Sequence, residues 1–365
     1  MGAAACAALP LRSFCKTPVA DRYSVAVLGD THYDVEPESV YHSHYDESNK
    51  WAKVQHEEFR RNGEMWRERC PRLVEASGAV SKSRDTQFVL QMGDIIQGDC
   101  DDAPTHVRML EDAVKSLRSP YPAGMPFLTV IGNHDFRGKG ARSAYMEFSE
   151  KFMAREILRL TGEECAARYP VYSFRFGPDL WVFCDFETKD LQPVVDSIES
   201  GVDARHVFLV THGPFTTPDG GGSFRWRLGG GRKCDALRPK LYEALSRRHA
   251  VVLSGHTHTT AYYRHENRFG GFCEFTANSV WAKPELATGK AIHSSVSDYG
   301  AMNLARLAGD KLQDFKESLD VFRHGLKDYF FSTAAGHYRL DVSDDAVQMS
   351  FYPGDERTPA WAVRL

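Results

Sequence analysis

The chain has 365 residues, of which 42% are hydrophobic and 26% charged, so it can bury a large core and form either one large domain or two. No apolar run approaches the roughly eighteen residues that a transmembrane helix needs. The net charge of -4 lacks the basic excess typical of nucleic-acid-binding proteins, and the eight scattered cysteines indicate neither a zinc knuckle nor a disulfide framework.

The first twenty residues form a tail whose apolar part, Gly2 to Leu11, is rich in alanine. It is similar to the end of an export signal, but only Met1 and Gly2 precede it, where a complete signal carries basic residues. Two interpretations stay open, a frayed tail and the remnant of a signal that starts upstream. We therefore expect a soluble protein, either cytoplasmic or extracytoplasmic.

Five short runs that end in Gly or Thr have the length and the Val, Leu, Ile and Phe content of strands buried on both faces. They are Tyr23 to Gly29, Gln87 to Gly93, Pro126 to Gly132, His206 to Thr211 and Ala250 to Gly255. Helical spacing occurs between them, at Glu57 to Val80, Pro104 to Leu117 and Asp235 to Arg248. The alternation predicts a layered α/β fold.

Two further pairs of strand-like runs flank short polar turns, which is typical of hairpins. The pairs are Val171 to Phe176 with Leu180 to Asp185, and His337 to Val342 with Ala346 to Tyr352. We expect both hairpins to extend a sheet.

Metal-capable side chains follow the five buried runs directly. They are Asp30, His32, Asp94, Asn133, His134, Asp135, His212, His256 and His258. Loops converge at the carboxyl ends of strands in open α/β sheets, so these residues would face one crevice. Two cations need a shared anionic bridge, for which Asp94 is suited because a carboxylate has two oxygens. The imidazoles shift the expected metal from Mg or Ca toward Mn, Fe, Zn or Co.

The five blocks resemble, in order, those of the calcineurin-like metallophosphoesterases. The blocks are Gly29-Asp-Thr-His32, Gly93-Asp94, Gly132-Asn-His-Asp135, Thr211-His-Gly213 and Gly255-His-Thr-His258. The resemblance runs from about Tyr23 to about Thr260, and the hairpin after Ser332 is similar to the closing strands of the family. It implies a four-layer α/β/β/α sandwich with two facing mixed β-sheets and the metal site at the carboxyl ends of the strands. It also implies one domain over residues 21–365, with insertions near 35–80, 216–234 and 278–330.

The same resemblance implies two divalent or trivalent transition-metal ions that share Asp94. One would be held by Asp30, His32, Asp94 and His258, and the other by Asp94, Asn133, His212 and His256. A metal-bridging hydroxide would attack a phosphate ester. His134 would protonate the leaving group or stabilise its charge, and Asp135 would hold the His134 ring. The iron-zinc purple acid phosphatases, a related branch, usually lack a His at position 32, so His32 disfavours that branch.

Substrate contacts are expected in the glycine-rich loop after His212. Arg225 and Arg227 could bind phosphate there and Trp226 could stack on a substrate ring, although an ordinary surface loop is the alternative. Such cations slightly favour phosphomonoesters over phosphodiesters as substrates. A non-catalytic binding protein on the same scaffold is the remaining alternative.

Overall fold

The computed structural model describes residues 21–35, 40–42, 52–219, 227–229, 237–280 and 294–365. Six strands form its first sheet, in the order β13-β12-β11-β1-β2-β3. Their bounds are β1 (Tyr23–Leu28), β2 (Thr86–Gln91), β3 (Phe127–Thr129), β11 (Gly336–Val342), β12 (Val347–Pro353) and β13 (Trp361–Arg364). Strands β1, β2 and β3 are parallel, whereas β11 pairs with β1 in the antiparallel sense, so the sheet is mixed.

Seven strands form the second sheet, in the order β10-β8-β9-β7-β6-β5-β4. Their bounds are β4 (Val171–Phe176), β5 (Asp179–Cys184), β6 (Val207–Thr211), β7 (Val251–Ser254), β8 (Thr260–Asn267), β9 (Gly270–Thr276) and β10 (Leu326–Ser332). Strands β5, β6, β7 and β9 run parallel, and β4, β8 and β10 pair in the antiparallel sense. This sheet is therefore mixed as well.

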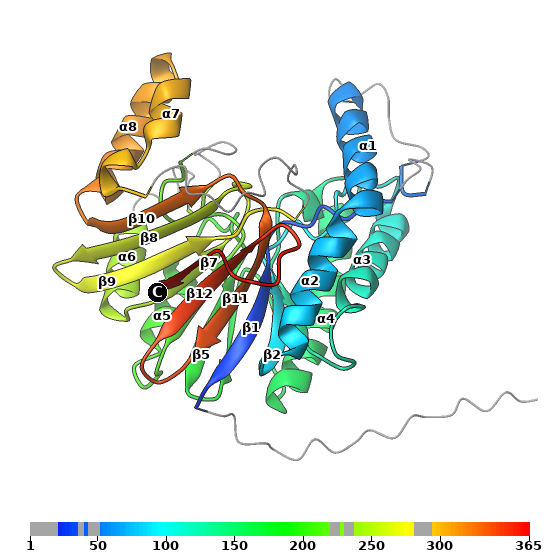
Figure 1. Cartoon of the computed structure of the whole chain (residues 1–365), viewed down its shortest axis with the longest axis horizontal. Helices are drawn as coiled ribbons and strands as arrows, with labels where there is room; N and C mark the ends of the chain where they lie inside the picture. Colours follow the sequence, from blue (N-terminus) through cyan, green and yellow to red (C-terminus); the bar gives the residue numbers. More distant parts are fainter. Residues whose placement is uncertain (1–20, 36–39, 43–51, 220–226, 230–236, 281–293) are drawn as a thin grey trace, which may run out of the picture.

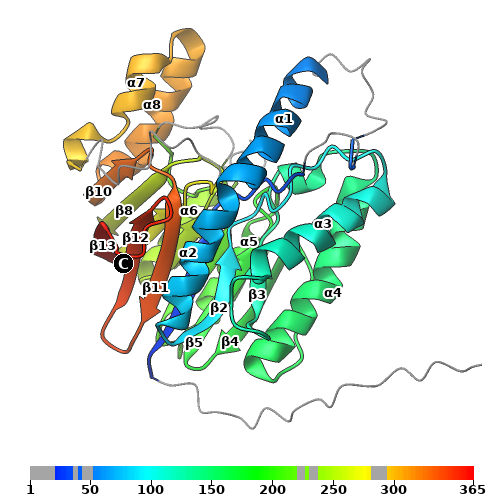
Figure 2. The same ribbon diagram turned by 45° about the vertical axis from the view of Figure 1, so that its right-hand side comes forward.

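Helices cover the outer face of each sheet (Figures 1 and 2). The first sheet is covered by α2 (Cys70–Lys82), α3 (Ala103–Arg118) and α4 (Ala141–Thr161), and the second by α5 (Gln192–Glu199) and α6 (Arg238–Arg247). The predicted α/β/β/α arrangement with two facing mixed sheets is confirmed. Among the helices that the structure describes, none combines the length and apolarity needed to cross a membrane.

The inner strands are apolar throughout because both of their faces are buried. In β6, Phe208 and Val210 belong to the core between the two sheets, whereas Leu209 packs in the second core under α5 and α6. Strand β5 divides in the same way, with Trp181 facing the other sheet and Val182 facing the helices. Alternate side chains of a strand point to opposite faces, so each such strand contributes to both cores.

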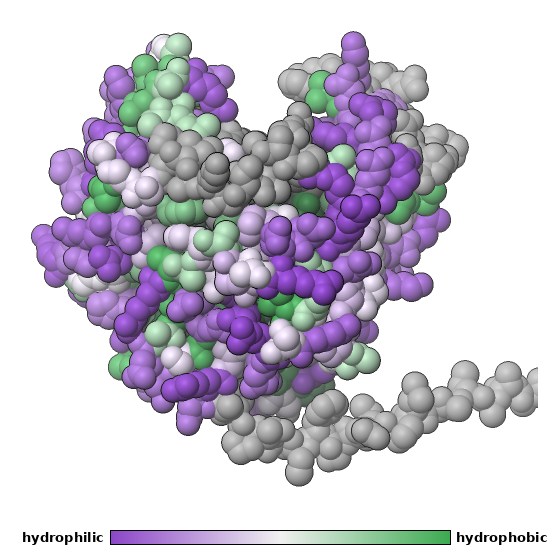
Figure 3. Space-filling model, viewed as in Figure 1, coloured by the Kyte–Doolittle hydropathy of each residue, from purple (hydrophilic) through white to green (hydrophobic). Residues whose placement is uncertain are grey.

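Three helices extend beyond the carboxyl ends of the parallel strands. They are α1 (Ala52–Glu68) on one side, and α7 (Ala301–Arg306) and α8 (Gly309–Arg323) on the other (Figure 1). The space-filling view shows them as two projections with a hollow between them (Figure 3). These three helices thus stand at the end of the fold where the polar strand-end residues lie.

One predicted helix, Glu57 to Val80, is wrong in its extent. The structure has two helices there, α1 and α2, which separate at Arg69. Pro71 lies in the first turn of α2, where its missing N–H costs nothing, but within one continuous helix it would remove a hydrogen bond. Both predicted hairpins are confirmed, as β4 with β5 and β11 with β12.

Candidate metal centre

The centre lies where parallel strands of the two sheets end side by side. Asp30, Asp94 and Asn133 follow β1, β2 and β3, whereas His212 and His256 follow β6 and β7. Two hydrogen bonds join the sheets at this edge. His212 Nδ1 donates to the Met92 carbonyl over 2.7 Å, and His256 N donates to Asp30 Oδ1 over 3.0 Å. The strand ends of both sheets are thereby held together.

Two groups of side chains converge at this edge. Ligand-capable atoms of Asp30, His32 and His258 lie within 4.8 Å of one another, and those of Asp94, His212 and His256 do so as well. Each group draws its members from one of the two predicted ligand sets. The side chains of Asp30, His32, Asp94 and His212 are buried. Asn133, His256 and His258 are half-buried, and the His258 side chain is 34% exposed.

Asp94 stands between the two groups. Its Oδ2 lies 3.2 Å from His212 Nε2 and 3.8 Å from His32 Nε2, one imidazole from each group. Asn133 Oδ1 lies 3.3 Å from His212 Nε2, which adds the predicted amide ligand to the second group. The structure therefore brings all seven predicted ligands together, and the assignment of each to a metal ion stays a prediction.

The protonation of these groups fits cation binding. Burial lowers the pKa of His32 and of His256 well below the usual range, so both rings are neutral and can offer a lone pair. His32 Nε2 and His258 Nε2 face each other across 3.1 Å. Carboxylate, amide and imidazole donors together suit Mn, Fe, Zn or Co, so these residues fit the two metal ions that the family implies.

His212 differs from the other imidazoles. Burial disfavours its charged form, but the carboxylates of Asp94 and Asp30 outweigh burial and raise its pKa to about 10. In the metal-free protein both ring nitrogens of His212 therefore carry a proton at neutral pH. Because a metal ligand must offer a lone pair, a cation that binds here has to displace one of these two protons.

The backbone at the centre is held in an uncommon conformation. His32, Asp94, His256 and His258 have φ values of 40°, 51°, 70° and 52°, in the left-handed region that non-glycine residues rarely adopt. The Asp94 carbonyl accepts hydrogen bonds from Thr31 N at 3.0 Å and His32 N at 2.8 Å. Each such residue costs about 1–3 kcal/mol, which the rest of the fold must offset, and such strain is typical of functional sites.

Two glycines let the backbone approach the acidic side chains closely. A Cβ at Gly132 would lie 2.1 Å from Asp94 Oδ1, and one at Gly255 would lie 2.4 Å from Asp30 Oδ1. Both distances are far inside van der Waals contact, so no side chain fits at either position without displacing a carboxylate. Close contact with a carboxylate thus explains why positions 132 and 255 are glycine.

His134 begins a short 3-10 helix, η1 (His134–Phe136), beside Asp94. Its backbone N donates to Asp94 Oδ1 at 2.7 Å, and its ring lies edge-on to the His32 ring at 4.3 Å. Its ring Nδ1 lies 3.0 Å from the Gln97 carbonyl. Burial lowers the pKa of His134 to about 4, so its ring is neutral at pH 7 in the free protein.

The expected contact of Asp135 with the His134 ring is wrong. The Asp135 carboxylate instead accepts four backbone N–H groups, at 2.8–3.3 Å, from Gly132, Asp94, Ile95 and Ile96. Successive side chains of a helical turn point in different directions, so Asp135 faces the loop while His134 faces the centre. Asp135 thereby fixes the loop that carries Asp94.

Sequence reasoning missed Phe186, which follows β5. Its ring lies 5.3 Å from that of His212 and 5.9 Å from that of His256, so it forms an apolar wall of the centre. It also missed the side chains of α1 that reach Gln97. Neither follows a motif block, so the sequence carries no local signal for them.

The predicted substrate contacts are only partly described. Arg225 and Trp226 lie outside the described residues. The Arg227 guanidinium donates to Thr217 Oγ1 at 3.0 Å and also to the Ser318 hydroxyl of α8. It thereby ties its loop to α8, and its role in phosphate binding stays a prediction.

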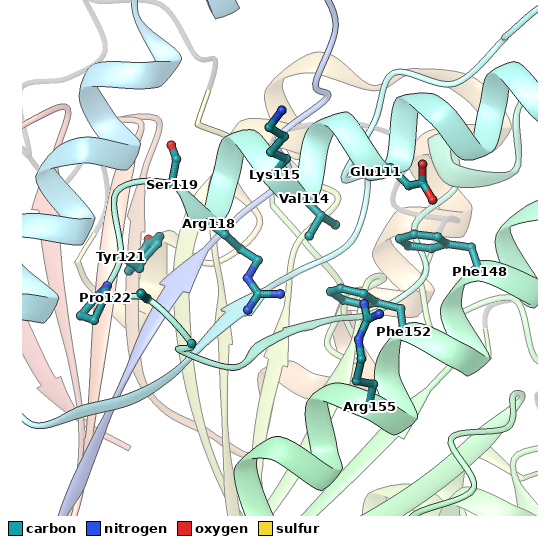
Figure 4. A pocket seen from close by; sticks show the side chains of 12 residues that line it. Glu111, Val114, Lys115, Arg118, Ser119, Tyr121, Pro122, Phe148, Phe152 and Arg155 are labelled. Carbon is teal, nitrogen blue, oxygen red and sulfur yellow. The ribbon is translucent and has the colours of Figure 1, made fainter. Parts of the chain in front are cut away.

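A cavity of about 610 Å³ lies apart from this centre, between the carboxyl-terminal half of α3 and α4. Phe148, Phe152 and Arg155 of α4 face Val114 and Arg118 of α3 across it (Figure 4). None of the seven predicted ligands lines this cavity. This cavity is therefore not part of the candidate metal centre.

Comparisons with known proteins identify the family of the chain. A family model described as calcineurin-like phosphoesterase matches residues 23–260. A comparison with curated proteins finds no match.

Solved structures share the fold at low sequence identity. GAP50, the anchor in the inner membrane complex of Plasmodium, is 14% identical with a TM-score of 0.50, over 94% of this chain and 88% of that one. The purple acid phosphatase PPD1 from yellow lupin (Lupinus luteus) seeds is 10% identical with a TM-score of 0.51, over 94% of this chain and 53% of that one. A dimetal phosphatase from Danio rerio is 12% identical with a TM-score of 0.49, over 95% of this chain and 99% of that one.

Proposed function

Since the chain belongs to the calcineurin-like phosphoesterase family, and is thereby a metal-dependent hydrolase of phosphate esters, we propose that its candidate metal centre holds two metal ions. The proposed ligands are Asp30, His32, Asp94, Asn133, His212, His256 and His258. The observation that carries this proposal is the position of Asp94, whose carboxylate faces imidazoles of both groups at 3.2 and 3.8 Å. Asp94 is the proposed bridge.

When bound, the metal ions would supply a water of lowered pKa and neutralise negative charge on the phosphate. The chain's own part is to hold the ligands and to exclude bulk water. Phe186 covers the imidazoles of His212 and His256 with an apolar ring, and most of the ligand side chains are buried. Charges interact more strongly in such a surrounding than in water.

We propose that His134 acts on the leaving group. A carbonyl can only accept, so the Gln97 carbonyl beside Nδ1 selects the ring form that carries a proton there, which leaves Nε2 for the substrate. The ring is neutral in the free protein, but the negative charge of a bound phosphate favours the protonated form. Nε2 can then deliver a proton to the departing oxygen.

We propose phosphomonoesters as the substrate class, with phosphodiesters as the alternative. A monoester is a dianion at neutral pH, so it benefits more from a nearby cation than a diester does. Arg137, which follows η1, is a cation near His134, but Glu58 pairs with it at 3.0 Å, so it supports this preference only in part. The predicted cation Arg227 points toward α8, so it supports this preference less than expected.

The test is metal analysis of purified protein together with turnover of an aryl phosphate monoester and a bis-aryl phosphate diester. Asp94→Ala should lose bound metal and activity, because it removes the shared carboxylate. Asp345→Asn is the matched control, since it removes an acidic charge from an exposed hairpin turn. An Asp94→Ala variant with two metals and full rates would overturn the assignment. A wild type that binds metal but hydrolyses neither ester would favour the binding-protein alternative.

A further inference from the structure

Helix α1 reaches the loop that carries the Gln97 carbonyl. The Asn62 side chain donates from Nδ2 to Gln97 Oε1, and Gln97 Nε2 donates to Glu58 Oε2 at 3.1 Å. Both ends of the Gln97 side-chain amide are therefore bonded to side chains of one helix. Asn62 and Glu58 lie four positions apart, on one face of α1.

Gln97 in turn is the hydrogen-bond partner of the His134 ring. Its backbone carbonyl lies 3.0 Å from His134 Nδ1. Since the side chain and the carbonyl belong to one residue, the side-chain bonds to α1 restrict where that carbonyl can lie. A continuous chain of contacts thus leads from α1 to the ring that faces the metal centre.

Glu58 adds a second link on the other side of His134. The same carboxylate oxygen that accepts from Gln97 also accepts from Arg137 Nη1 at 3.0 Å. The Arg137 backbone N donates to the His134 carbonyl at 3.0 Å, and Asp99 N donates to the Arg137 carbonyl at 2.8 Å. Glu58 therefore contacts both Gln97, which bonds the His134 ring, and Arg137, which bonds the His134 backbone.

The side chains of Asn62 and Gln97 are buried, which indicates that their contact does more than attach α1 to the loop. Asn62 and Gln97 are each only 1% exposed, and a buried polar group left without a partner costs about 1–3 kcal/mol. Apolar residues at both positions would pack α1 equally well without that risk. A bonded amide pair differs from an apolar pair in allowing one orientation only, which matters where a carbonyl must be aimed at a ring.

We propose that α1 positions the catalytic ring of His134, with Asn62 and Glu58 as positioning residues that act through Gln97 and Arg137. The proposal deepens the proposed function and rests on it, because it assumes that His134 acts on the leaving group. Neither residue belongs to a motif block of the sequence. The insertion that carries α1 is then part of the catalytic apparatus.

The test compares turnover of an aryl phosphate with a good leaving group, para-nitrophenyl phosphate, and one with a poor leaving group, phenyl phosphate. His134→Ala should slow phenyl phosphate about 100-fold or more and the nitrophenyl ester much less, because a good leaving group needs little protonation. Asn62→Ala should reproduce this selectivity in weaker form, slowing phenyl phosphate about 10-fold, with KM and bound metal unchanged.

Glu58 provides a pair of variants that separates positioning from folding. Glu58→Gln keeps an oxygen that can accept from Gln97, so it should retain more activity on phenyl phosphate than Glu58→Ala. Arg60→Ala is the matched control, because it breaks only the surface ion pair of α1 with Glu64. It should leave the ratio of the two rates as in the wild type.

A double variant shows through which residue Asn62 acts. In a His134→Ala background, Asn62→Ala should cause no further loss on phenyl phosphate, since the ring it positions is gone. Equal slowing of both substrates by Asn62→Ala, or full additivity with His134→Ala, would overturn the positioning role. If His134→Ala itself slows both substrates equally, the leaving-group role of His134 is wrong instead, so the two failures are distinguishable.

Discussion

Gly132→Ala should remove metal from the centre without changing any proposed ligand. The added methyl group would lie 2.1 Å from Asp94 Oδ1 and 2.2 Å from Asp94 N. Because carbon atoms do not approach that closely, Asp94 or the loop at residue 132 must move by roughly 1 Å. Metal sites tolerate deviations of only about 0.2 Å in ligand distance, so the shared carboxylate would no longer fit both groups.

The magnitude follows from that displacement. A misplacement of about 1 Å costs about 100-fold in rate, and the overpacking itself costs about 1–3 kcal/mol of unfolding free energy. The assay is metal content after dialysis, turnover of an aryl phosphate, and urea unfolding. We expect fewer than two metals per chain and at least the stated loss of rate.

Gly201→Ala is the matched control. Its Cβ would lie 2.9 Å from Leu180 Cδ2 and 3.0 Å from Val207 Cγ2. Both residues lie at the amino-terminal ends of their strands, β5 and β6, whereas the metal centre lies at the carboxyl ends. The Ile198 carbonyl would lie 3.2 Å away, and none of these three residues is a proposed metal ligand, so this variant should lose stability while keeping its metals. A Gly132→Ala protein with two metals and wild-type turnover would refute the argument that Asp94 must stay in place.

Three further predictions concern charge and protonation. Asp135→Asn should lower the unfolding free energy by about 2 kcal/mol, because some of the four N–H groups lose their acceptor. The ratio of the rates on phenyl phosphate and para-nitrophenyl phosphate should stay as in the wild type. If that ratio changes as it does in His134→Ala, Asp135 holds the His134 ring after all. Binding of Mn²⁺ to chelator-treated protein at pH 7 should release a proton, because the pKa of His212 is raised to about 10; calorimetry in buffers of different ionisation enthalpy measures this, and no release would contradict it. Burial lowers the pKa of His337 to about 4, below its unfolded value of about 6.5, so the unfolded chain binds more protons in between and stability should fall as pH falls through that window. Urea unfolding at pH 7 and pH 5 should show a smaller loss for His337→Gln than for the wild type, and equal losses would count against this cause.

The sequence by itself determined the layered α/β fold and predicted which residues meet at the strand ends. Asp30, Asp94 and His212 each follow a short buried strand directly, and this is a local signal because strand length, burial on both faces and the glycine before each block can be read within ten residues. The parallel order of those strands then brings their carboxyl ends to one edge. Gly132 is part of the same local pattern, but the sequence alone did not reveal how closely its backbone approaches Asp94.

Only the tertiary structure decided which side chains meet around those ligands. Asn62 and Gln97 lie 35 positions apart, and Arg227 is bonded to a residue 91 positions away. Asp135 and His134 are neighbours in sequence, yet their side chains bond different groups. Periodicity and turn chemistry act over a few residues and can be read from the chain, whereas a hydrogen-bond partner depends on how whole elements pack. The role of α1 beside His134 therefore became visible only once the helix was seen against the loop that it contacts.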